Sequence, residues 1–557
     1  MKATSNNDVL DLFIVGGGIN GCGIARDAAG RGLNVALAEM NDLGSGTSSA
    51  STKLIHGGLR YLEYFEFRLV RESLEEREVL LRTMPHIIWP LRFVLPYHHK
   101  MRFESDTPAS RLLNSIMPWQ RGRRPAWLIR LALLMYDSFG KRSILPSTSA
   151  VQLSHSPEGQ PLRDEFHRAF EYSDCWVQDS RLVILNARDA AEKGALIMPR
   201  TRVINAKRKA TYWTIITKDV NGNHHSFKSR TLINATGPWA SNFLENVIGI
   251  PKNDKLRLVR GSHIVTKRLF AHEKCYLFQG TDGRIVFVIP YEQDFTLIGT
   301  TDYDQDSVVD RPECTQQEIA YLLEFVSKYF KKPITRSDVV WTYSGVRPLY
   351  NASKSSASAA SRDYVICFEE FEPPLLNIFG GKLTTYRKLA ETVLQKLIKY
   401  FPHCGPSWTA DRALPGGDFS VNGVPVLAKL LCESYPYLNN EWAYRLIRHY
   451  GTDAHKILEG TSKVSDLGEN FTTTVTEREI EWVVKKEWVY TAEDFLWRRT
   501  RLGLRFQEEA TKRLDNCIQK LRASNFGDKH ISWSKKIPNN KHKHQLTCVY
   551  NNEDYIL

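Results

Sequence analysis

Residues 11–39 read DLFIVGGGINGCGIARDAAGRGLNVALAE, and this stretch decides the fold. A short apolar run, Leu12 to Val15, suits a buried parallel strand. Gly16, Gly18 and Gly21 follow in the spacing G-x-G-x-x-G. This spacing allows a tight turn, close approach of backbone to a pyrophosphate, and close packing of the next helix on the strand.

The same stretch ends with a second apolar strand over residues 34–38 and with the acidic residue Glu39. A carboxylate about 20 residues past the glycines can accept hydrogen bonds from a ribose. The helix between the strands would point its N-terminal N–H groups at the phosphates. A glycine turn without a ligand is the alternative, and the complete order of strand, helix, strand and acid argues against it. We expect an α/β fold with a Rossmann-like unit.

Composition narrows the class of protein less than the glycine motif does. The 557 residues suffice for about two or three domains. A net charge of +13, from 75 Lys and Arg against 62 Asp and Glu, permits anionic substrates, anionic membrane surfaces or nucleic acid. The nine cysteines contain no C-x-x-C pair, so we expect neither a metal site nor a disulfide scaffold.

Membrane insertion is not expected from the sequence. The N-terminus lacks the apolar core of a signal peptide, and no run approaches the ~18–20 apolar residues of a spanning helix. Residues 110–142, however, mix Arg with Trp, Leu and Ile, and a helix is expected from Pro125 to about Phe139. Such a helix can lie on an anionic lipid surface. A buried packing helix with a solvated basic flank is the alternative.

A second loop follows Glu39 and is rich in hydroxyl groups, glycine and cations. It reads GSGTSSAST over residues 44–52 and KLIHGGLRY over 53–61. In a dinucleotide domain it would lie along the pyrophosphate and the reactive ring. Flexible linkers seldom concentrate such side chains, so a linker is the weaker interpretation.

Residues 46–81, GTSSASTKLIHGGLRYLEYFEFRLVRESLEEREVLL, resemble the flavin-dependent, respiratory (aerobic) glycerol-3-phosphate dehydrogenase family. The similarity continues in register from about residue 8 to 520; residues of about 100–123 look like an insertion, and the tail after about 525 is unmatched. Further matching stretches are FEYSDCWVQDSRLVILNA, INATGPW, GSHIV, RIVFVIP, IGTTD, WTYSGVRPL, FGGKLTTYRKLAE, VSDLGENF and LWRRTRLGL.

The resemblance implies an α/β plus α architecture like that of D-amino-acid oxidase and glutathione reductase. A Rossmann-like FAD-binding domain would combine residues 8–85, 165–240 and 345–395. A mixed-sheet domain facing substrate and membrane would combine 86–164 and 241–344. A C-terminal helical domain would span 396–525, and 526–557 would form a flexible tail.

The resemblance also implies which residues contact FAD. Val203 matches the position whose backbone holds the adenine, and Gly380 and Gly381 let backbone approach the flavin ring. The full set of implied FAD contacts is Gly16, Gly18, Gly21, Glu39, Thr47, Ser48, Ser49, Lys53, Gly57, Val203, Gly237, Gly381, Lys382, Leu383 and Thr384.

Substrate phosphate recognition needs fixed cations, and the rigid fork of Arg can bind two oxygens at once. The substrate-binding residues implied by the resemblance are Arg60, Tyr61, Arg347, Arg362 and Lys382. A surface salt bridge is the alternative for any single cation. Their common position in glycine-bearing loops at strand ends argues against it.

Oxidation of a secondary alcohol to a ketone removes a hydride and a proton. FAD would accept the hydride, and His56 is the preferred base because it precedes Arg60 on the same loop. His263 is the alternative base, and Arg347 could polarise the hydroxyl instead. A structural histidine that only hydrogen-bonds backbone remains open for both positions.

The implied function is oxidation of sn-glycerol 3-phosphate to dihydroxyacetone phosphate, with electrons passed to a membrane quinone. A glycerol-3-phosphate oxidase that uses dioxygen is the nearest alternative. A nucleic-acid-binding protein and a bare NAD(P) dehydrogenase explain fewer of the motifs, so no nucleic-acid partner is expected. The resemblance also implies a peripheral homodimer at the cytoplasmic face of the inner membrane.

Overall fold

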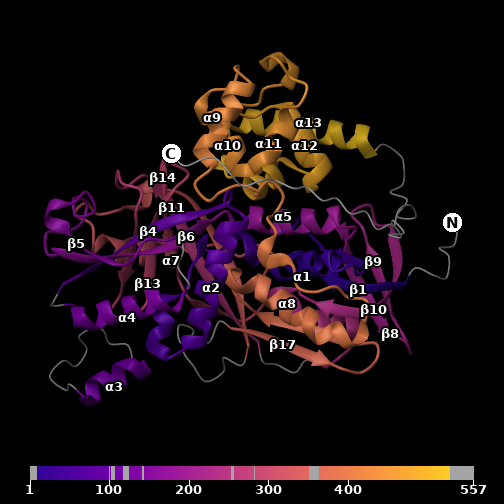
Figure 1. Ribbon diagram of the computed structural model, residues 1–557, viewed down its shortest axis with the longest axis horizontal. Helices are drawn as coiled ribbons and strands as arrows, with labels where there is room; N and C mark the ends of the chain where they lie inside the picture. The colour runs from indigo at the N-terminus through magenta and orange to yellow at the C-terminus, as the bar shows by residue number, and fades with distance from the viewer. Residues whose placement is uncertain are drawn as a thin grey trace, which may run out of the picture.

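The computed structural model describes residues 9–98, 101, 107–116, 125–140, 144–251, 256–281, 283–350 and 363–526. Two large sheets lie beside each other, and the helices α9 to α13 gather on one side of them (Figure 1). The helices α3 (Pro108–Ile116) and α4 (Ala126–Phe139) lie at the lower left of the same view, away from α9 to α13.

The first sheet is built around the glycine turn. Its main path is β17-β18-β10-β1-β2-β7, and the antiparallel hairpin of β8 and β9 continues from β10. Its strands are β1 (Val9–Val15), β2 (Val35–Ala38), β7 (Leu196–Met198), β8 (Arg202–Arg208), β9 (Trp213–Lys218), β10 (His224–Asn234), β17 (Tyr364–Glu369) and β18 (Leu375–Gly380). β1 begins three residues before the predicted apolar run, because Val9 and Leu10 already pair with β10.

Three helices pack together on this sheet. They are α1 (Ile19–Gly30), α5 (Asp179–Glu192) and α8 (Tyr386–Leu397). Leu12 and Ile14 of β1 join apolar side chains of these helices in one buried core. The alternation of β1 side chains explains this, since Leu12 and Ile14 share one face and Phe13 and Val15 join the core on the other.

The second sheet is mixed. Its path is β15-β11-β14-β13-β12-β4-β6-β3, with β16 on β11 and β5 on β6, and β4 and β12 are its parallel pair. Its strands are β3 (Leu54–Ile55), β4 (Ile88–Tyr97), β5 (Ser149–Gln152), β6 (Arg168–Val177), β11 (Leu256–Lys267), β12 (Cys275–Gln279), β13 (Ile285–Tyr291), β14 (Phe295–Gly299), β15 (Tyr303–Gln305) and β16 (Val339–Tyr350).

Helices cover both faces of the second sheet. α7 (Gln316–Ser327) closes one buried core, and α2 (Phe67–Thr83) with α4 closes the other. The strands of this sheet come from wider stretches than 86–164 and 241–344. β3, β6 and the end of β16 all pair into it.

The C-terminal helices have a core of their own. They are α9 (Val424–Ser434), α10 (Asn440–Tyr450), α11 (Ala454–Leu458), α12 (Glu477–Glu487) and α13 (Glu508–Phe526); the short α6 (Ala240–Phe243) follows β10. Buried ion pairs join them to α5, from Arg181 to Glu487 and from Arg188 to Asp453. The predicted fold class, α/β with a mixed second sheet and a helical C-terminal part, is confirmed.

Candidate active site

The glycine turn leaves no room for side chains. A Cβ on Gly16, whose φ is +110°, would lie 2.4 Å from the carbonyl oxygen of Ala235. A Cβ on Gly21 would lie 1.9 Å from the carbonyl oxygen of Gly16, and one on Gly18 would lie 3.2 Å from Ser48 Oγ. The turn therefore brings bare backbone to the start of α1, as a dinucleotide pyrophosphate requires.

Glu39 and Ser48 frame this turn. The Glu39 carboxylate accepts hydrogen bonds from Gly17 N at 2.7 Å and Asn41 N at 2.8 Å. Burial raises the pKa of Glu39, and the backbone hydrogen bonds oppose that shift. Ser48 Oγ accepts a hydrogen bond from Ile19 N at 3.0 Å, so it sits at the N-terminus of α1.

The carboxyl ends of β1, β10 and β18 lie side by side, because the three strands are parallel neighbours. Gly237 follows β10 with φ +59°, and Gly380 and Gly381 end β18 with φ +71° and +100°. Asn20 Nδ2 donates to the Gly380 carbonyl at 3.2 Å, which ties this turn to α1. The other predicted FAD contacts on this side are Val203 in β8 and Leu383 and Thr384 in the turn before α8.

One face of the second sheet carries two of the three predicted catalytic residues, His263 and Arg347. Phe287, Gly299, His263 and Tyr343 are directly opposite neighbours across β13, β14, β11 and β16. Opposite residues of antiparallel strands place their side chains on the same face. Arg347 lies four residues after Tyr343 on β16, so it shares this face.

Two glycines make space on that face. A Cβ on Gly299 would lie 2.0 Å from the His263 ring, and one on Gly261 would lie 2.4 Å from Arg347 Nη2. Arg347 is oriented by Asp302, which accepts from its Nη1 at 2.5 Å, and by Thr300 Oγ1, 3.1 Å from its Nη2. A guanidinium fixed in this way is suited to bind an anion.

His263 is fully buried. Its ring stacks on Tyr343, and its Nε2 lies 3.0 Å from Thr52 Oγ1. Burial, and then the charge of Arg347, hold the pKa of His263 well below its usual range, which favours the neutral ring.

His56 is more open than His263. It is half-buried, and its ring meets the ring of Phe287 edge-on at 6.0 Å between centroids. Its carbonyl oxygen accepts a hydrogen bond from Thr384 Oγ1 at 3.5 Å, which connects the 53–61 loop to the turn after β18. The ring of His56 therefore lies beside the row of opposite residues Phe287, Gly299, His263 and Tyr343, called the Phe287–Tyr343 row below.

Of the remaining predicted substrate residues, Lys382 and Tyr61 contact each other. Lys382 Nζ lies 4.0 Å from the centroid of the Tyr61 ring, and Arg60 Cζ lies 6.0 Å from that of Tyr64. The first contact links the turn after β18 to the 3-10 turn over residues 59–64. Arg362 lies outside the described residues.

Lys53, a predicted FAD contact, makes a buried ion pair. Its ammonium donates to both carboxylate oxygens of Asp179, at 2.9 and 3.0 Å, and to the Ser49 carbonyl at 3.1 Å. Burial lowers the pKa of Lys53 to about 8. Direct contact of Lys53 and Ser49 with FAD stays a prediction. Two other predicted FAD contacts also have protein partners: Thr47 Oγ1 donates to the Val346 carbonyl and Gly57 N to Tyr136 Oη.

Sequence reasoning missed several partners of these residues. Asp302 and Thr300 hold Arg347, Tyr343 stacks on His263, and Asp179 pairs with Lys53. All four lie in stretches that carried the family resemblance (IGTTD, WTYSGVRPL and FEYSDCWVQDSR). For Thr300, Asp302 and Asp179, the usable signal was a polar residue within three positions after an apolar strand.

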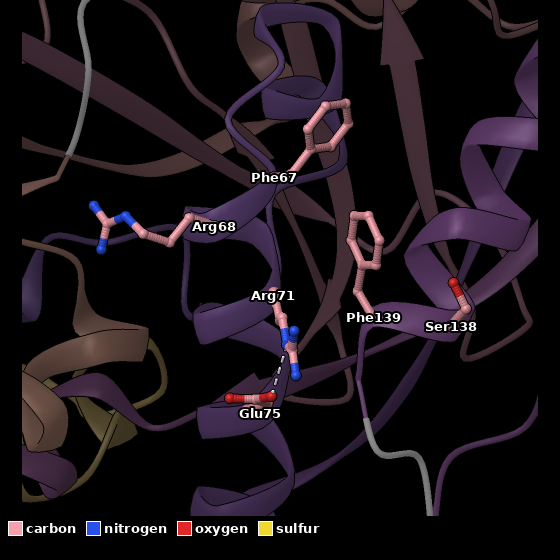
Figure 2. Close-up of a pocket in the computed structure, with 6 residues that line it drawn as sticks. All are labelled: Phe67, Arg68, Arg71, Glu75, Ser138 and Phe139. Atoms are coloured by element: carbon pink, nitrogen blue, oxygen red, sulfur yellow. Dashed lines mark hydrogen bonds and ion pairs between the residues drawn. The ribbon is translucent and has the colours of Figure 1, made fainter.

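A groove with a volume of about 530 Å³ lies elsewhere, between α2 and α4 (Figure 2). Its lining residues are Phe67, Arg68, Arg71, Glu75, Ser138 and Phe139. None of them belongs to the glycine turns or to the Phe287–Tyr343 row, so the groove is separate from the candidate active site. Across the described residues, no three His, Cys, Asp or Glu side chains gather as a metal site would require.

Comparison with known proteins defines the class. Residues 11–387 match the family described as FAD dependent oxidoreductase, and residues 407–535 match the C-terminal domain of alpha-glycerophosphate oxidase. Because the first match spans more than half of the chain, the chain belongs to the FAD-dependent oxidoreductase family. FAD is the cofactor. The turn formed by Gly16, Gly18 and Gly21, called the glycine cradle below, fits its pyrophosphate, and Glu39 fits its ribose.

Full-length relatives narrow the class. D-erythritol 1-phosphate dehydrogenase of Brucella abortus is 45% identical over 90% of this chain and 96% of its own length. Glycerol-3-phosphate dehydrogenase of Pseudomonas aeruginosa is 44% identical over 92% of this chain and 95% of its own length. These matches confirm the family predicted from the motifs, the FAD-dependent glycerol-3-phosphate dehydrogenases.

A solved structure shares the fold. The glycerol-3-phosphate dehydrogenase from Bacillus halodurans, complexed with FAD, superposes with a TM-score of 0.67. It covers 93% of this chain and 95% of its own, at 24% sequence identity.

Proposed function

We propose that this enzyme oxidises sn-glycerol 3-phosphate to dihydroxyacetone phosphate and passes the electrons to a membrane quinone. The observation that carries the proposal is Arg347, fixed by Asp302 and Thr300 on the sheet face that also bears His263. An oriented guanidinium beside the FAD cradle suits a small anionic alcohol. FAD, when bound, supplies the hydride acceptor.

The protein's own residues divide the remaining tasks. Arg347 and Lys382 hold the phosphate and hydroxyl groups, with Arg60 and Tyr61 on the opposite loop. His56 takes the proton of the hydroxyl group. Its half-buried position supports this role over His263, which has no exposed surface and is engaged with Thr52 and Tyr343.

A second substrate is favoured by one specific observation, the 45% identity with a D-erythritol 1-phosphate dehydrogenase. Erythritol phosphate is a straight-chain polyol monophosphate like glycerol 3-phosphate and is longer by one CHOH unit. Both share the phosphate and a neighbouring polyol chain, so the same cations suit both.

Anaerobic titration of the FAD-loaded enzyme separates the substrates. Bleaching of the flavin absorbance is expected with glycerol 3-phosphate. The rate constant of flavin reduction, divided by the half-saturating substrate concentration, should be higher for glycerol 3-phosphate than for D-erythritol 1-phosphate. The reverse order reassigns the substrate to the longer polyol phosphate. No bleaching with either compound rejects a polyol phosphate substrate.

The electron acceptor is tested separately. With glycerol 3-phosphate as the donor, we expect reduction of a soluble short-chain quinone to exceed release of hydrogen peroxide in air. Stoichiometric peroxide without quinone reduction would instead identify a glycerol-3-phosphate oxidase.

The exposed face of α4 supports a peripheral place on an anionic membrane surface. Trp127, Leu131 and Leu134 are 54, 47 and 51% exposed at positions i, i+4 and i+7, and Arg130 is exposed beside them. Leu133 and Tyr136 bury the opposite side of the helix. A helix anchored on one side and apolar with a cation on the other suits the lipid interface.

The support for a membrane surface comes from α4 alone within the described residues. Arg121, Arg123 and Arg124, which belong to the predicted basic segment, lie outside the described residues. No helix in the ranges that the structure describes is both long and apolar enough to cross a bilayer. The proposal places the enzyme at the cytoplasmic face of the inner membrane.

A further inference from the structure

Arg501 reaches from the C-terminal part of the chain to the loop after β2 and to the start of α5. Its Nη2 donates to Asp179 Oδ1 at 2.8 Å, to Ser180 Oγ at 3.3 Å and to the Ser49 carbonyl at 3.4 Å. Its side chain is buried. A cation supplied by the C-terminal part therefore touches the loop that follows β2 and the first residues of α5.

The segment 47–53 is held at nearly every residue. Ser48 Oγ caps α1, and Thr52 Oγ1 lies 3.0 Å from His263 Nε2. The Ser51 carbonyl accepts a hydrogen bond from Tyr343 Oη at 2.8 Å, and Ser51 Oγ donates to Asp179 at 2.8 Å. The segment thus connects the N-terminus of α1 to the sheet face that carries His263 and Arg347.

This conformation includes strained backbone. Lys53 has φ +60°, a left-handed conformation that residues other than glycine seldom adopt. Such backbone persists only where surrounding contacts fix it. Here the Lys53 side chain is fixed by Asp179 and the Ser49 carbonyl, and both of these acceptors also bind Arg501.

Contacts other than those of Arg501 also dock the C-terminal helices. Arg499 pairs with Asp42, Trp497 stacks on Trp341 with centroids 4.4 Å apart, and Arg188 pairs with Asp453. Without Arg501, Asp179 would keep Lys53 as its cationic partner. Arg501 Nη1 donates to the Trp497 carbonyl within the same C-terminal stretch, and its Nη2 contacts Asp179, Ser180 and Ser49.

We propose that Arg501 is a positioning residue, through which the C-terminal part holds the 47–53 segment closed over the bound FAD. The inference rests on FAD occupying the glycine cradle. It assigns the C-terminal helical part a role in cofactor retention, although that part contributes no residue to the predicted catalytic set.

The test compares R501Q with R188Q, a matched control. Arg188 is also a buried arginine that bridges α5 and the C-terminal helices, but it pairs with Asp453 and Glu192 and makes no contact with the 47–53 segment. The rate of FAD release is followed by the recovery of flavin fluorescence on dilution. R501Q should release FAD about tenfold faster or more, as loss of a charge-assisted hydrogen bond predicts, while R188Q stays near the wild-type rate.

A second readout needs no cofactor. Lys53 is buried, so trypsin cleavage after Lys53 in the FAD-free protein reports opening of the segment. Mass spectrometry should detect this cleavage earlier in R501Q than in R188Q or wild type. R501K, which keeps a charge but loses the fork, should fall between wild type and R501Q in both assays.

Three outcomes overturn the inference. Equal acceleration in R501Q and R188Q would mean that Arg501 acts only through general docking. Wild-type rates of FAD release and of cleavage after Lys53 in R501Q would mean that Arg501 does not hold the 47–53 segment. If R501Q does not fold, R501K decides: wild-type rates in both assays reject the proposal. A wild-type protein that never binds FAD would instead reject the cofactor site itself.

Discussion

The ring of His263 lies nearly parallel to the ring of Tyr343, with centroids 4.7 Å apart and an angle of 10° between the planes. Tyr343 in turn donates to the Ser51 carbonyl, and His263 contacts Thr52. This pair therefore fixes the loop beside the glycine cradle. His263 is thus part of a buried contact with this loop, whereas His56 is half-buried and lies outside the pair.

We expect His56→Asn to slow flavin reduction at saturating glycerol 3-phosphate by about 10²–10⁴-fold, the usual contribution of a general base. The half-saturating concentration should change little, because no phosphate contact is lost. Stopped-flow absorbance gives both quantities. His263→Asn is the control and should lower the melting temperature while it leaves the limiting rate within about threefold; the opposite pattern would make His263 the base.

Arg347→Lys should raise the half-saturating concentration of glycerol 3-phosphate roughly tenfold to a hundredfold, since the planar fork is lost and the charge is kept. Arg257→Lys is the control, because Arg257 on β11 also pairs with an aspartate and donates to both carboxylate oxygens of Asp304 on β15. If Arg347→Lys instead abolishes reduction at saturation, Arg347 takes part in the proton chemistry.

Glu39→Gln should weaken FAD binding by roughly 1.5–3 kcal/mol, because a carboxylate that can accept from the ribose is replaced by a neutral amide. The dissociation constant is measured by titration of FAD into the cofactor-free protein. Asp466→Asn, which changes a surface carboxylate that accepts from Ser462 N, should leave it unchanged. Wild-type affinity in Glu39→Gln would count against the ribose assignment.

Replacing Trp127, Leu131 and Leu134 with Ser should reduce co-sedimentation with anionic phospholipid vesicles, since these side chains form the exposed apolar stripe of α4. Val426→Ser with Leu430→Ser is the control, because these residues are 61 and 45% exposed on α9. Equal loss of binding in both variants would place the membrane contact elsewhere. Raised salt should weaken binding of the wild type.

Acid should destabilise the fold through His86 and His449. Burial, and then the charge of nearby arginines (Arg181 for His86, Arg445 for His449), lower the pKa of each ring to about 3. Between pH 6.5 and 3 each of these two rings therefore binds a proton more readily in the unfolded chain than in the folded protein. Stability should fall with decreasing pH by up to about 1.4 kcal/mol per unit for each ring.

Urea unfolding at pH 7.5 and 5.5 measures this slope. His86→Phe removes one titrating ring and should reduce the loss of stability on acidification. The comparison of variant and wild type is needed because Asp174, whose pKa burial raises to about 6, works in the opposite direction. An unchanged slope in His86→Phe would show that His86 does not carry the effect.

Local patterns were sufficient for the elements around the glycine turn. The apolar run before Gly16 and the spacing of the glycines depend on neighbours in sequence, and β1, the turn and α1 form where expected. The helix expected after Pro125 is α4, with Pro125 at its N-terminal boundary. These signals are local because apolar periodicity, glycine spacing and helix-start residues are read within a few neighbouring positions.

The contacts that complete the site could not be predicted from local patterns. Asp302 lies 45 residues before Arg347, and Asp179 lies 126 residues after Lys53. Such partners are chosen by the pairing of distant strands and by the packing of α5, not by spacing. Lys53 illustrates the difference: its place in a cofactor loop was readable, and its buried ion pair was not.

The order of synthesis gives the Arg501 contact a further consequence. Ser49 and Arg501 are 452 residues apart in the chain. At about 5–20 residues per second, the ribosome needs roughly 20–90 s between them. During that interval the glycine cradle can fold while Arg501 has not yet been synthesised. On the proposal above, the 47–53 segment of the nascent chain is then held less tightly, so FAD binds through a more open segment than in the finished protein.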